Sequence, residues 1–402
     1  MQSTINDLVR DSRVLCVVGA GGVGKTTTAA ALGVCAAAAG RRVLIVTIDP
    51  ARRLATALGL DEIGQQVRTV QIPAHGDLPA LTLHAMMLDL KGAWDDMVRR
   101  LARDEKQRDA ILGNHFYHYL STSLAGAQEY IACEQLFTLC TERDYDLIVL
   151  DTPPSAHAID FFEAPGRVLD VLENDAIKLL LTPSLVAGRA SLRLLDLGGR
   201  YVLRVLTKLV GMEMLHALAE FLLAFEGMYP HARDRTQGFR QIFSSPTTSF
   251  LVVATPTRQA LAEAAELTDR LQRDGLHLGA LVINQIYFPV DPLPAPERFA
   301  QTLSDVVGVQ RGEHLTRAAL ETVRQRNRRA AVEREVVDTM LGRLASHPRV
   351  FVSRLAADVH DMETLIGVAR ELCASPAGDL RVASPFGDFP GSSTARTDEV
   401  AT

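Results

Sequence analysis

A glycine-rich segment near the start of the chain, Gly19 to Thr26, has the residue types and spacing of a phosphate-binding loop. It reads GAGGVGKT and fits the pattern G-x-x-x-x-G-K-[ST]. Glycines let backbone N–H groups converge on phosphate oxygens, and a helix that begins at the end of the loop adds the positive end of its dipole. Lys25 is therefore expected to bind the β- and γ-phosphates of a nucleotide, and the Thr26 hydroxyl to bind Mg²⁺. The predicted phosphate-binding residues are Gly19, Gly21, Gly22, Val23, Gly24, Lys25, Thr26 and Thr27.

Two aspartates follow predicted strands and are further candidates for chemistry at this site. Asp151 follows the predicted strand 146–150 and is expected to hold Mg²⁺ through a water molecule. Asp49 follows the predicted strand 43–48 and precedes Pro50. Because proline favours the first position of a helix and aspartate favours its N-cap, one interpretation of Asp49 is a helix cap.

The order of apolar runs and helical segments predicts an α/β fold. A strand at 14–18, an alanine-rich helix at 26–39 and a strand at 43–48 form one βαβ unit with parallel strands. Continuous apolar runs of this kind are typical of strands buried on both faces of a parallel sheet. We therefore predict a doubly wound, mostly parallel sheet of the P-loop NTPase type. Its other strands are expected at 82–87, 146–150, 250–254, 279–283 and 350–352, and the other helices at 93–103, 111–120, 127–140, 258–273, 311–345 and 361–373.

Residues 167–243 interrupt this alternation, because they contain no strand-like run, and charges are sparse across 201–229. One interpretation is a helical subdomain that packs on itself or on a dimer partner. The other is an apolar groove for a hydrophobic partner, because three of the nine methionines lie here. The expected helices are 168–181, 192–209 and 213–228, and the three methionines are Met212, Met214 and Met228.

The domain organisation follows from these elements. The nucleotide-binding core is expected to comprise 13–166 and 244–373, with the helical insert at 167–243 between its two parts. Residues 374–402 are predicted to be a disordered tail, because Pro, Gly, Ser, Thr and Ala dominate there.

Composition and charge describe an ordinary globular chain of 402 residues, 47% hydrophobic and 22% charged, with a formal net charge of −6. The acidic balance argues against a nucleic-acid partner and against a polybasic membrane anchor. Early charged residues argue against a signal peptide, and no uncharged apolar stretch is long enough for stable membrane insertion. The five cysteines include no C-x-x-C pair and are interpreted as thiols in a reducing compartment. We therefore expect a cytoplasmic protein.

Several separated motifs make the chain similar to the ArsA-type ATPases, a family that contains arsenite-pump ATPases and targeting ATPases for tail-anchored membrane proteins. The resemblance implies MgATP as the bound species, water orientation by Asp49 and adenine recognition by Asn284. It also implies a homodimer, or a dimer with a paralogous subunit, and client-binding helices within 167–243. The motifs resemble the deviant Walker A at 21–27, switch I at 47–51, switch II at 151–157, the adenine-reading loop at 282–285 and a second adenine-side loop at 348–359.

The chain departs from the family pattern in ways that bear on mechanism. Ala20 stands where the family has a lysine that reaches across the dimer to the partner's nucleotide. No cysteine pair follows Asn284, so the zinc site of the eukaryotic targeting dimer is not expected. Arg52 and Arg53 directly follow the switch I motif and are candidates to supply the missing cation, in cis or from the partner; otherwise they are solvated residues of a helix first turn.

The function predicted from the sequence is an ATP-hydrolysing dimeric switch. Its closure on ATP is expected to couple to binding of a hydrophobic or membrane-protein client. Two alternatives remain open at this point: the ATPase subunit of an arsenite or anion efflux pump, and a slow-hydrolysing nucleotide sensor. A membrane-positioning ATPase is disfavoured, because the tail 374–402 has no amphipathic helix pattern.

Overall fold

The computed structural model describes residues 4–49, 52–123, 127–142, 144–152, 162, 166, 212–225, 228–291, 296–344, 347–355 and 358–374. They fall into two compact units. The first, called here the sheet unit, draws on residues 1–87, 145–156 and 246–402, and the second, the helical unit, on 88–144 and 157–245. The structure thus groups the helices within 91–143 with those near 212–243, whereas the sequence prediction assigned them to the core.

The sheet unit is built on one eight-stranded sheet with the order β3-β4-β2-β5-β1-β6-β7-β8. All neighbouring strands pair in parallel except β3, which pairs antiparallel with β4. The predicted doubly wound, mostly parallel fold is therefore confirmed. The strands are β1 (Val14–Gly19), β2 (Val43–Thr47), β3 (Arg68–Ile72), β4 (Leu81–Met87), β5 (Leu147–Asp151), β6 (Thr248–Ala254), β7 (Leu278–Ile286) and β8 (Arg349–Ser353).

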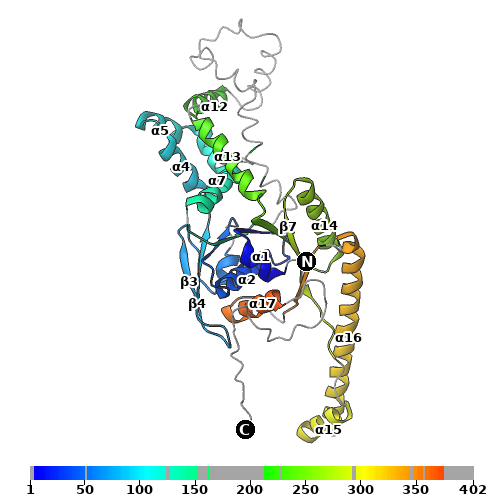
Figure 1. The fold of residues 1–402 in the computed structure, drawn as a ribbon. Coiled ribbons are helices and arrows are strands. Elements are labelled where there is room, and N and C mark those ends of the chain that lie inside the picture. The colour runs from blue at the N-terminus through cyan, green and yellow to red at the C-terminus, as the bar shows by residue number, and fades with distance from the viewer. Residues whose placement is uncertain are drawn as a thin grey trace, which may run out of the picture. The chain divides into compact units, whose positions relative to one another are not determined.

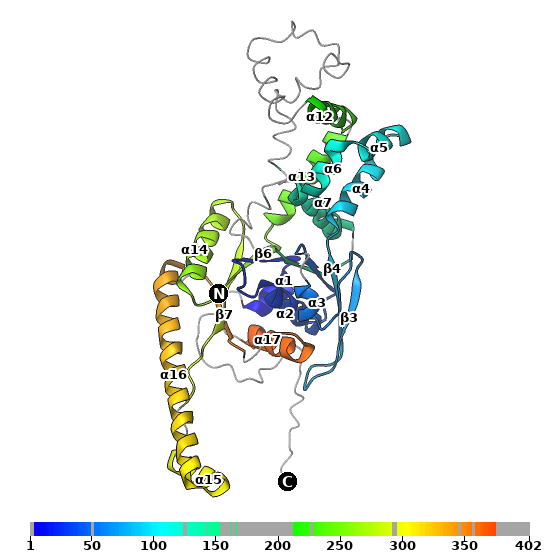
Figure 2. The same cartoon turned by 180° about the vertical axis from the view of Figure 1, so that it is seen from behind.

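The helices of the sheet unit include α1 and α15, which the sequence analysis did not predict. Helix α1 precedes the first predicted strand, and α15 precedes the predicted helix 311–345. Helix α15 and the N-terminal half of α16 form a hairpin (Figures 1 and 2). The helices are α1 (Ile5–Asp11), α2 (Lys25–Ala38), α3 (Arg53–Ala57), α14 (Arg258–Arg273), α15 (Pro296–Val307), α16 (Val309–Leu341) and α17 (Met362–Ala374).

Strand order decides which face of the sheet each crossover helix covers. The chain moves from β1 to β2 in one direction across the sheet and from β6 to β7 in the other. Because such crossovers are right-handed, α2 and α14 lie on opposite faces. Helix α17 packs on α2, and α1 packs beside both. The carboxyl ends of β1, β2 and β5, which are neighbours in the sheet, therefore meet where α2 begins.

Small residues allow α2 to approach the sheet closely. The helix buries a run of alanines, and Gly33 stands directly over β2. A Cβ atom at Gly33 would lie 2.4 Å from Cδ1 of Ile45 and 2.8 Å from its Cγ1. The close packing of α2 holds the phosphate-binding loop, which immediately precedes it, against the strand ends.

Cysteine pairing corrects the sequence analysis. Cys35 of α2 and Cys373 of α17 form a disulfide, with Cα atoms 6.8 Å apart and 338 residues between them in sequence. The interpretation of all five cysteines as thiols was therefore wrong for this pair. The reason is tertiary: α2 and α17 pack side by side, which no local cysteine spacing reveals. Cys16, Cys133 and Cys140 are thiols.

The helical unit has its own hydrophobic core, which includes Trp94, Tyr117 and Phe221. Side chains also anchor α12 through its backbone: Asn114 Nδ2 donates to the carbonyl of Ala217 at 2.9 Å, and Gln107 Nε2 to that of Ala224 at 2.5 Å. The helices are α4 (Leu90–Leu101), α5 (Glu105–Leu112), α6 (His115–Ser123), α7 (Ala127–Glu142), α12 (Met212–Phe225) and α13 (Tyr229–Phe243).

The described part of the predicted insert thus packs into a helical core. Met228, one of the three methionines considered for an apolar groove, is only 1% exposed within that core. The expected helices 168–181 and 192–209 lie outside the described residues, as does the tail from 375 onward.

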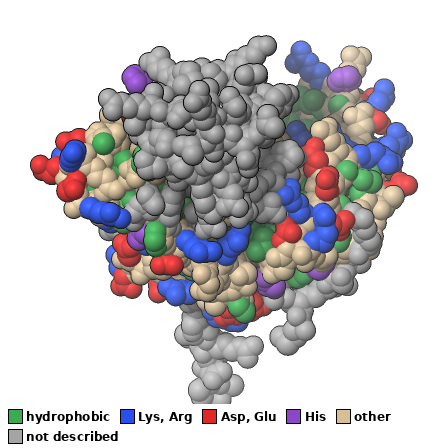
Figure 3. All heavy atoms as spheres, turned by 90° about the horizontal axis from the view of Figure 1, so that it is seen from above, with side chains coloured by type: hydrophobic (Ala, Val, Ile, Leu, Met, Phe, Trp, Pro, Cys, Tyr) green, Lys and Arg blue, Asp and Glu red, His purple; other side chains and the backbone are tan. Residues whose placement is uncertain are grey.

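Basic and acidic side chains of the described residues are interspersed on the face shown in Figure 3. Among the helices that the structure describes, we find none with both the length and the apolar character needed to cross a bilayer.

Substituting two helical glycines tests the close approach of α2 to the sheet. We expect Gly33→Ala to lower the free energy of unfolding by about 1–3 kcal/mol, since the added methyl group overlaps Ile45. Gly367→Ala in α17 is the matched control, because a Cβ there meets nothing within 4 Å. The control should raise the free energy of unfolding by up to about 1 kcal/mol through helix propensity. Urea unfolding followed by circular dichroism distinguishes them, and equal effects would contradict the packing argument.

Candidate functional site

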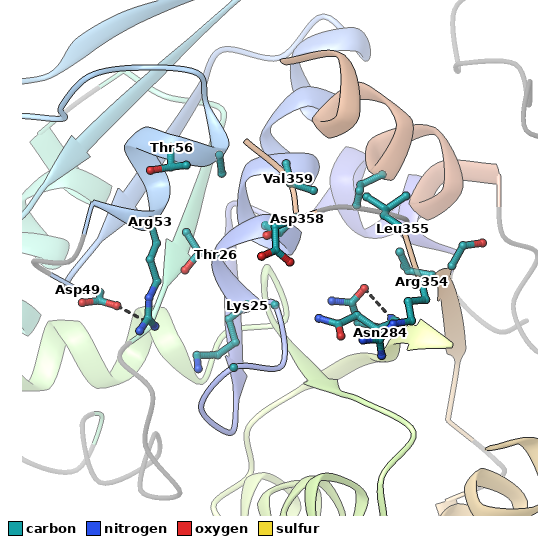
Figure 4. A pocket seen from close by; sticks show the side chains of 18 of the residues that line it. Lys25, Thr26, Asp49, Arg53, Thr56, Asn284, Arg354, Leu355, Asp358 and Val359 are labelled. Atoms are coloured by element: carbon teal, nitrogen blue, oxygen red, sulfur yellow. Dashed lines mark hydrogen bonds and ion pairs between the residues drawn. The ribbon is translucent and has the colours of Figure 1, made fainter. Parts of the chain in front are cut away.

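A cavity of about 540 Å³ opens at the carboxyl ends of the central strands of the sheet unit (Figure 4). It brings together most of the residues that the sequence analysis assigned to one site. Of the predicted set, Gly22, Gly24, Lys25, Thr26, Thr27, Asp49, Arg52, Arg53 and Asn284 line it. Asp151, Gly19, Gly21 and Val23 are not among the lining residues. Asp151 lies beside the cavity, hydrogen-bonded to Thr26.

The loop conformation requires glycine at particular positions. Gly24 is the N-cap of α2 and has φ +94°, in the left-handed region that disfavours other residues. A Cβ atom there would lie 2.1 Å from Nδ2 of Asn284. Gly19, at φ +150°, would bring a Cβ atom within 2.3 Å of the Val253 carbonyl oxygen on β6. The glycines therefore let β6 and β7 pack directly against the loop.

The side chain of Lys25 folds back onto its own loop. Its Nζ donates a hydrogen bond to the carbonyl of Ala20 at 2.8 Å, and the residue is only 6% exposed. Burial lowers the pKa of Lys25, while the nearby Asp151 carboxylate opposes that shift. The ammonium group is thus held at the cavity by a backbone acceptor that phosphate oxygens can replace.

Asp151 is a buried carboxylate shared by two other segments. The hydroxyls of Thr26 and Thr47 both donate to its Oδ2, at 2.9 and 3.0 Å. Burial raises the pKa of Asp151 to about 6, although both hydroxyls and Lys25 act against that rise. Its other oxygen, Oδ1, is buried without a hydrogen-bond partner. An oxygen ligand left over beside the Thr26 hydroxyl fits a hard cation such as Mg²⁺.

The cation site would be incomplete without the nucleotide. In the described residues, no group of three or more His, Cys, Asp or Glu side chains could hold a metal ion. Mg²⁺ commonly binds proteins through one or two oxygen ligands and takes the remainder from phosphates and water. Thr26 and Asp151 match that pattern.

Asp49 lines the cavity and is not the N-cap of helix α3, which was one interpretation of the sequence. Helix α3 begins at Arg53 with Arg52 as its N-cap, so Asp49 does not cap it. The Asp49 carboxylate instead pairs with Arg53 at 3.5 Å (Figure 4). The Asp49 side chain is 15% exposed, against 60% for Arg53. Arg53 is thus a largely exposed cation in contact with the predicted water-orienting carboxylate.

Thr47 has a role that the sequence analysis did not assign, although the residue belongs to the quoted switch I motif. Its hydroxyl donates to Asp151 and accepts a hydrogen bond from the backbone N–H of Asp49, at 3.2 Å. One hydroxyl therefore joins the ends of β2 and β5 and holds the two aspartates in a defined relation. The contact depends on β2 and β5 being neighbours, which the sequence alone does not show.

Asn284 lies at the other end of the cavity and is engaged with the loop itself. Its Nδ2 donates to the carbonyl of Val23 at 2.9 Å, and its Oδ1 accepts from the N–H of Gln285 at 2.9 Å. Gln285 has φ +60°, which places it in the left-handed region. The side chain of Asn284 thereby fastens the end of β7 to the phosphate-binding loop.

Residues that follow β8 complete this end of the cavity. Arg354, Leu355, Asp358 and Val359 line it, and Arg354 lies beside Asn284 in Figure 4. They fall within the segment 348–359 that resembled a second adenine-side loop, but the sequence analysis named no individual residue there. Only the packing of β8 against β7 identifies which side chains reach the cavity.

Comparison with protein families agrees with the geometry. Residues 12–302 match the family model described as the anion-transporting ATPases of the ArsA type. That span includes the phosphate-binding loop, both aspartates and Asn284.

Curated relatives match over most of their own length. The chain is 26% identical over 294 residues to "ATPase get3" of Aspergillus terreus, covering 72% of this chain and 77% of that protein. It is 25% identical over 295 residues to "ATPase GET3" of Podospora anserina, covering 72% and 78%. Each relative is thus matched over about three quarters of its own length.

The buried Asp151 carboxylate predicts a pH-dependent stability difference. Because its folded-state pKa of about 6 exceeds the ordinary value of 3.8, the folded state binds its proton more tightly than the unfolded state. The stabilising contribution is therefore complete below about pH 4 and is lost as the pH rises through about 6. The free energy of unfolding of Asp151→Asn should therefore rise relative to that of wild type, by on the order of 3 kcal/mol between about pH 4 and pH 8.

The measurement is urea unfolding of both proteins without nucleotide or Mg²⁺ across that pH range. Comparing how the free energy of unfolding changes with pH in the two proteins removes any pH-independent cost of placing an amide at this position. A difference between the two proteins that does not vary with pH would contradict the raised pKa.

Proposed function

This chain belongs to the anion-transporting ATPase family of the ArsA type and hydrolyses ATP, and we propose that it does so as a dimeric switch that binds a hydrophobic or membrane-protein client. The observation that carries the proposal is the contact of Thr47 with both Asp151 and Asp49. It joins the predicted cation ligand to the predicted water-orienting carboxylate. A change at one is therefore transmitted to the other through a single hydroxyl.

The nucleotide is expected to lie along the cavity with its phosphates at the loop 19–26. Lys25 exchanges the Ala20 carbonyl for phosphate oxygens, and the loop amides and the α2 N-terminus contribute further donors. Thr26 and Asp151 would hold Mg²⁺, which when bound neutralises phosphate charge. Asn284 lies at the end of the cavity where the base would be.

Hydrolysis requires a water molecule in line with the γ-phosphate. Asp49 is the residue proposed to orient it, and its present contact with Arg53 must rearrange for this to happen. The γ-phosphate is itself an acceptor for Arg53, so nucleotide binding and release of Asp49 favour each other. This exchange gives the switch its physical basis.

Because position 20 is not a lysine, another cation must stabilise the negative charge that develops on the phosphate in the transition state. Arg52 and Arg53 both line the cavity beside Asp49. We propose that one of them faces the γ-phosphate in the closed dimer, from the same subunit or from its partner, which is a second copy or a paralogous subunit. A cation of this kind contributes on the order of 10³–10⁵ in rate.

The client assignment rests on the resemblance to targeting ATPases and on the predicted helical insert 167–243, of which 167–211 lies outside the described residues. A second candidate function is favoured by the description of the matched family as anion-transporting. In that alternative, the chain would be the ATPase subunit of an arsenite or anion pump. Ala20, which stands where the family has a lysine, supports a third candidate function, a slow-hydrolysing nucleotide sensor.

Separate substitutions identify the cation. We expect either Arg52→Ala or Arg53→Ala to lower kcat for ATP at least about 100-fold, because the developing phosphate charge loses its partner. The other variant should retain turnover within about threefold. Phosphate release under saturating MgATP measures both. Wild-type rates in both variants would exclude the two arginines from this role.

A hydrolysis-deficient variant tests the switch and separates it from the pump. Asp49→Asn with ATP should form a stable dimer and retain a fluorescent peptide carrying one apolar helix, whereas Lys25→Ala with ATP should do neither. Light scattering and fluorescence anisotropy give the two readouts. Stimulation of wild-type turnover by arsenite, without peptide binding, would instead support the pump.

A further inference from the structure

Tyr287 stands at the point where the chain leaves the base end of the cavity. It follows β7 directly, three residues after Asn284. The strand is irregular here, because Gln285 has φ +60° and the pairing with β8 shifts register between Ile283 and Ile286. The backbone is thus irregular just before Tyr287, although Ile286 still pairs with Ser353 of β8.

Three guanidinium groups surround the Tyr287 ring. Their Cζ atoms lie 4.6 Å from the ring centroid for Arg329, 5.7 Å for Arg354 and 5.8 Å for Arg326. Energetically significant contacts of this type occur about once in 70–80 residues, so three on one ring mark a specific arrangement. Arg326 and Arg329 belong to α16, whereas Arg354 follows β8.

Helix α16 fixes the position of Tyr287 through its backbone as well. The N–H of Tyr287 donates to Glu333 Oε2 at 2.8 Å, and Glu333 also pairs with Arg329 at 3.2 Å. Asn327 bonds both backbone groups of Val290, accepting from its N–H at 2.7 Å and donating to its carbonyl at 2.8 Å. The segment from Tyr287 to Val290 is therefore tied to α16 at both ends.

Arg354 connects this arrangement to the nucleotide site. Its backbone N–H donates to the carbonyl of Ile286 at 2.9 Å, which keeps it beside Tyr287. Its side chain lines the cavity next to Asn284, at the end away from Asp49 (Figure 4). Among the described contacts, the Arg354 guanidinium makes no ion pair with a carboxylate. Its donors and its flat face are thus available to a ligand in the cavity.

We propose that Tyr287 is a positioning residue for nucleotide binding: its ring, fixed by α16, holds the Arg354 guanidinium against the base end of the cavity. The inference rests on the proposed function, because it takes the phosphates to lie at Lys25 and the base at Asn284. A guanidinium plane stacks on aromatic faces, and every nucleic-acid base offers such a face. Arg354 thereby contributes to affinity for the base, and Tyr287 contributes through Arg354.

The test compares a ligand that has a base with one that has only phosphates. Dissociation constants of the full chain are measured for MgATP and for magnesium tripolyphosphate. We expect Tyr287→Ala to weaken MgATP binding about three- to tenfold and to leave tripolyphosphate binding unchanged. KM for ATP should rise by the same factor, with kcat unaltered.

Three further variants separate positioning from a general loss of structure. Tyr287→Phe keeps the ring and should retain wild-type affinity. Arg354→Ala should reproduce the loss seen in Tyr287→Ala, and the double variant should be no weaker than Arg354→Ala alone. Tyr145→Ala is the matched control, because Tyr145 is also half-buried under an arginine, Arg42 at 5.2 Å, but lies outside the cavity lining. It should bind both ligands as wild type does.

The outcomes that would overturn the inference are distinct from failure of the proposed function. Equal weakening of MgATP and tripolyphosphate, additive losses in the double variant, or a loss in kcat with unchanged KM would each exclude this positioning role. Those results leave ATP hydrolysis at the site intact. If the wild-type chain bound tripolyphosphate and MgATP equally, no base contact would exist, and the placement of the nucleotide would fail as well.

Discussion

The carboxylate of Asp151 is the group on which the rest of the nucleotide site depends. It is buried at the end of β5, where a charge is unfavourable unless neighbouring groups compensate it. Thr26 from the loop and Thr47 from β2 supply two hydrogen bonds, and Lys25 supplies a nearby positive charge. Two segments, the loop and the end of β2, are thereby joined to one oxygen atom of β5. The other oxygen, Oδ1, is buried without a hydrogen-bond partner and is the atom predicted to face the cation.

The parallel sheet makes this convergence possible. Because β1 lies between β5 and β6, and β2 lies beside β5, the loop that follows β1 and the aspartates that follow β2 and β5 share one edge. Strand β7 brings Asn284 to the same edge from the other side. As a result, the residues along the cavity change from the Asp49–Arg53 ion pair at one end, through Lys25, to Asn284 and Arg354 at the other.

Outside the sheet, packing assigns different tasks to apolar and charged helices. Helix α12, whose composition alone was compatible with a binding groove, contributes Phe221 to a closed core in the helical unit. Helix α16, which carries many charged residues, uses Arg326, Arg329 and Glu333 to hold the segment that follows β7.

The sequence by itself indicated the loop, the two aspartates, Asn284 and the positions of the main parallel strands along the chain, because these are encoded by short motifs and by continuous apolar runs. The sequence also contains signals for α1 and β3, two elements that were not among those predicted. Thr4 and Asp7 form a capping box that starts α1, and the alternating pattern of β3 is typical of an edge strand. Only the tertiary structure decided the Cys35–Cys373 disulfide, the bridging contact of Thr47 and the placement of Tyr287 beside Arg354. Each of these joins segments that are distant in the chain, and their contact follows from strand order and helix packing rather than from local residue preference.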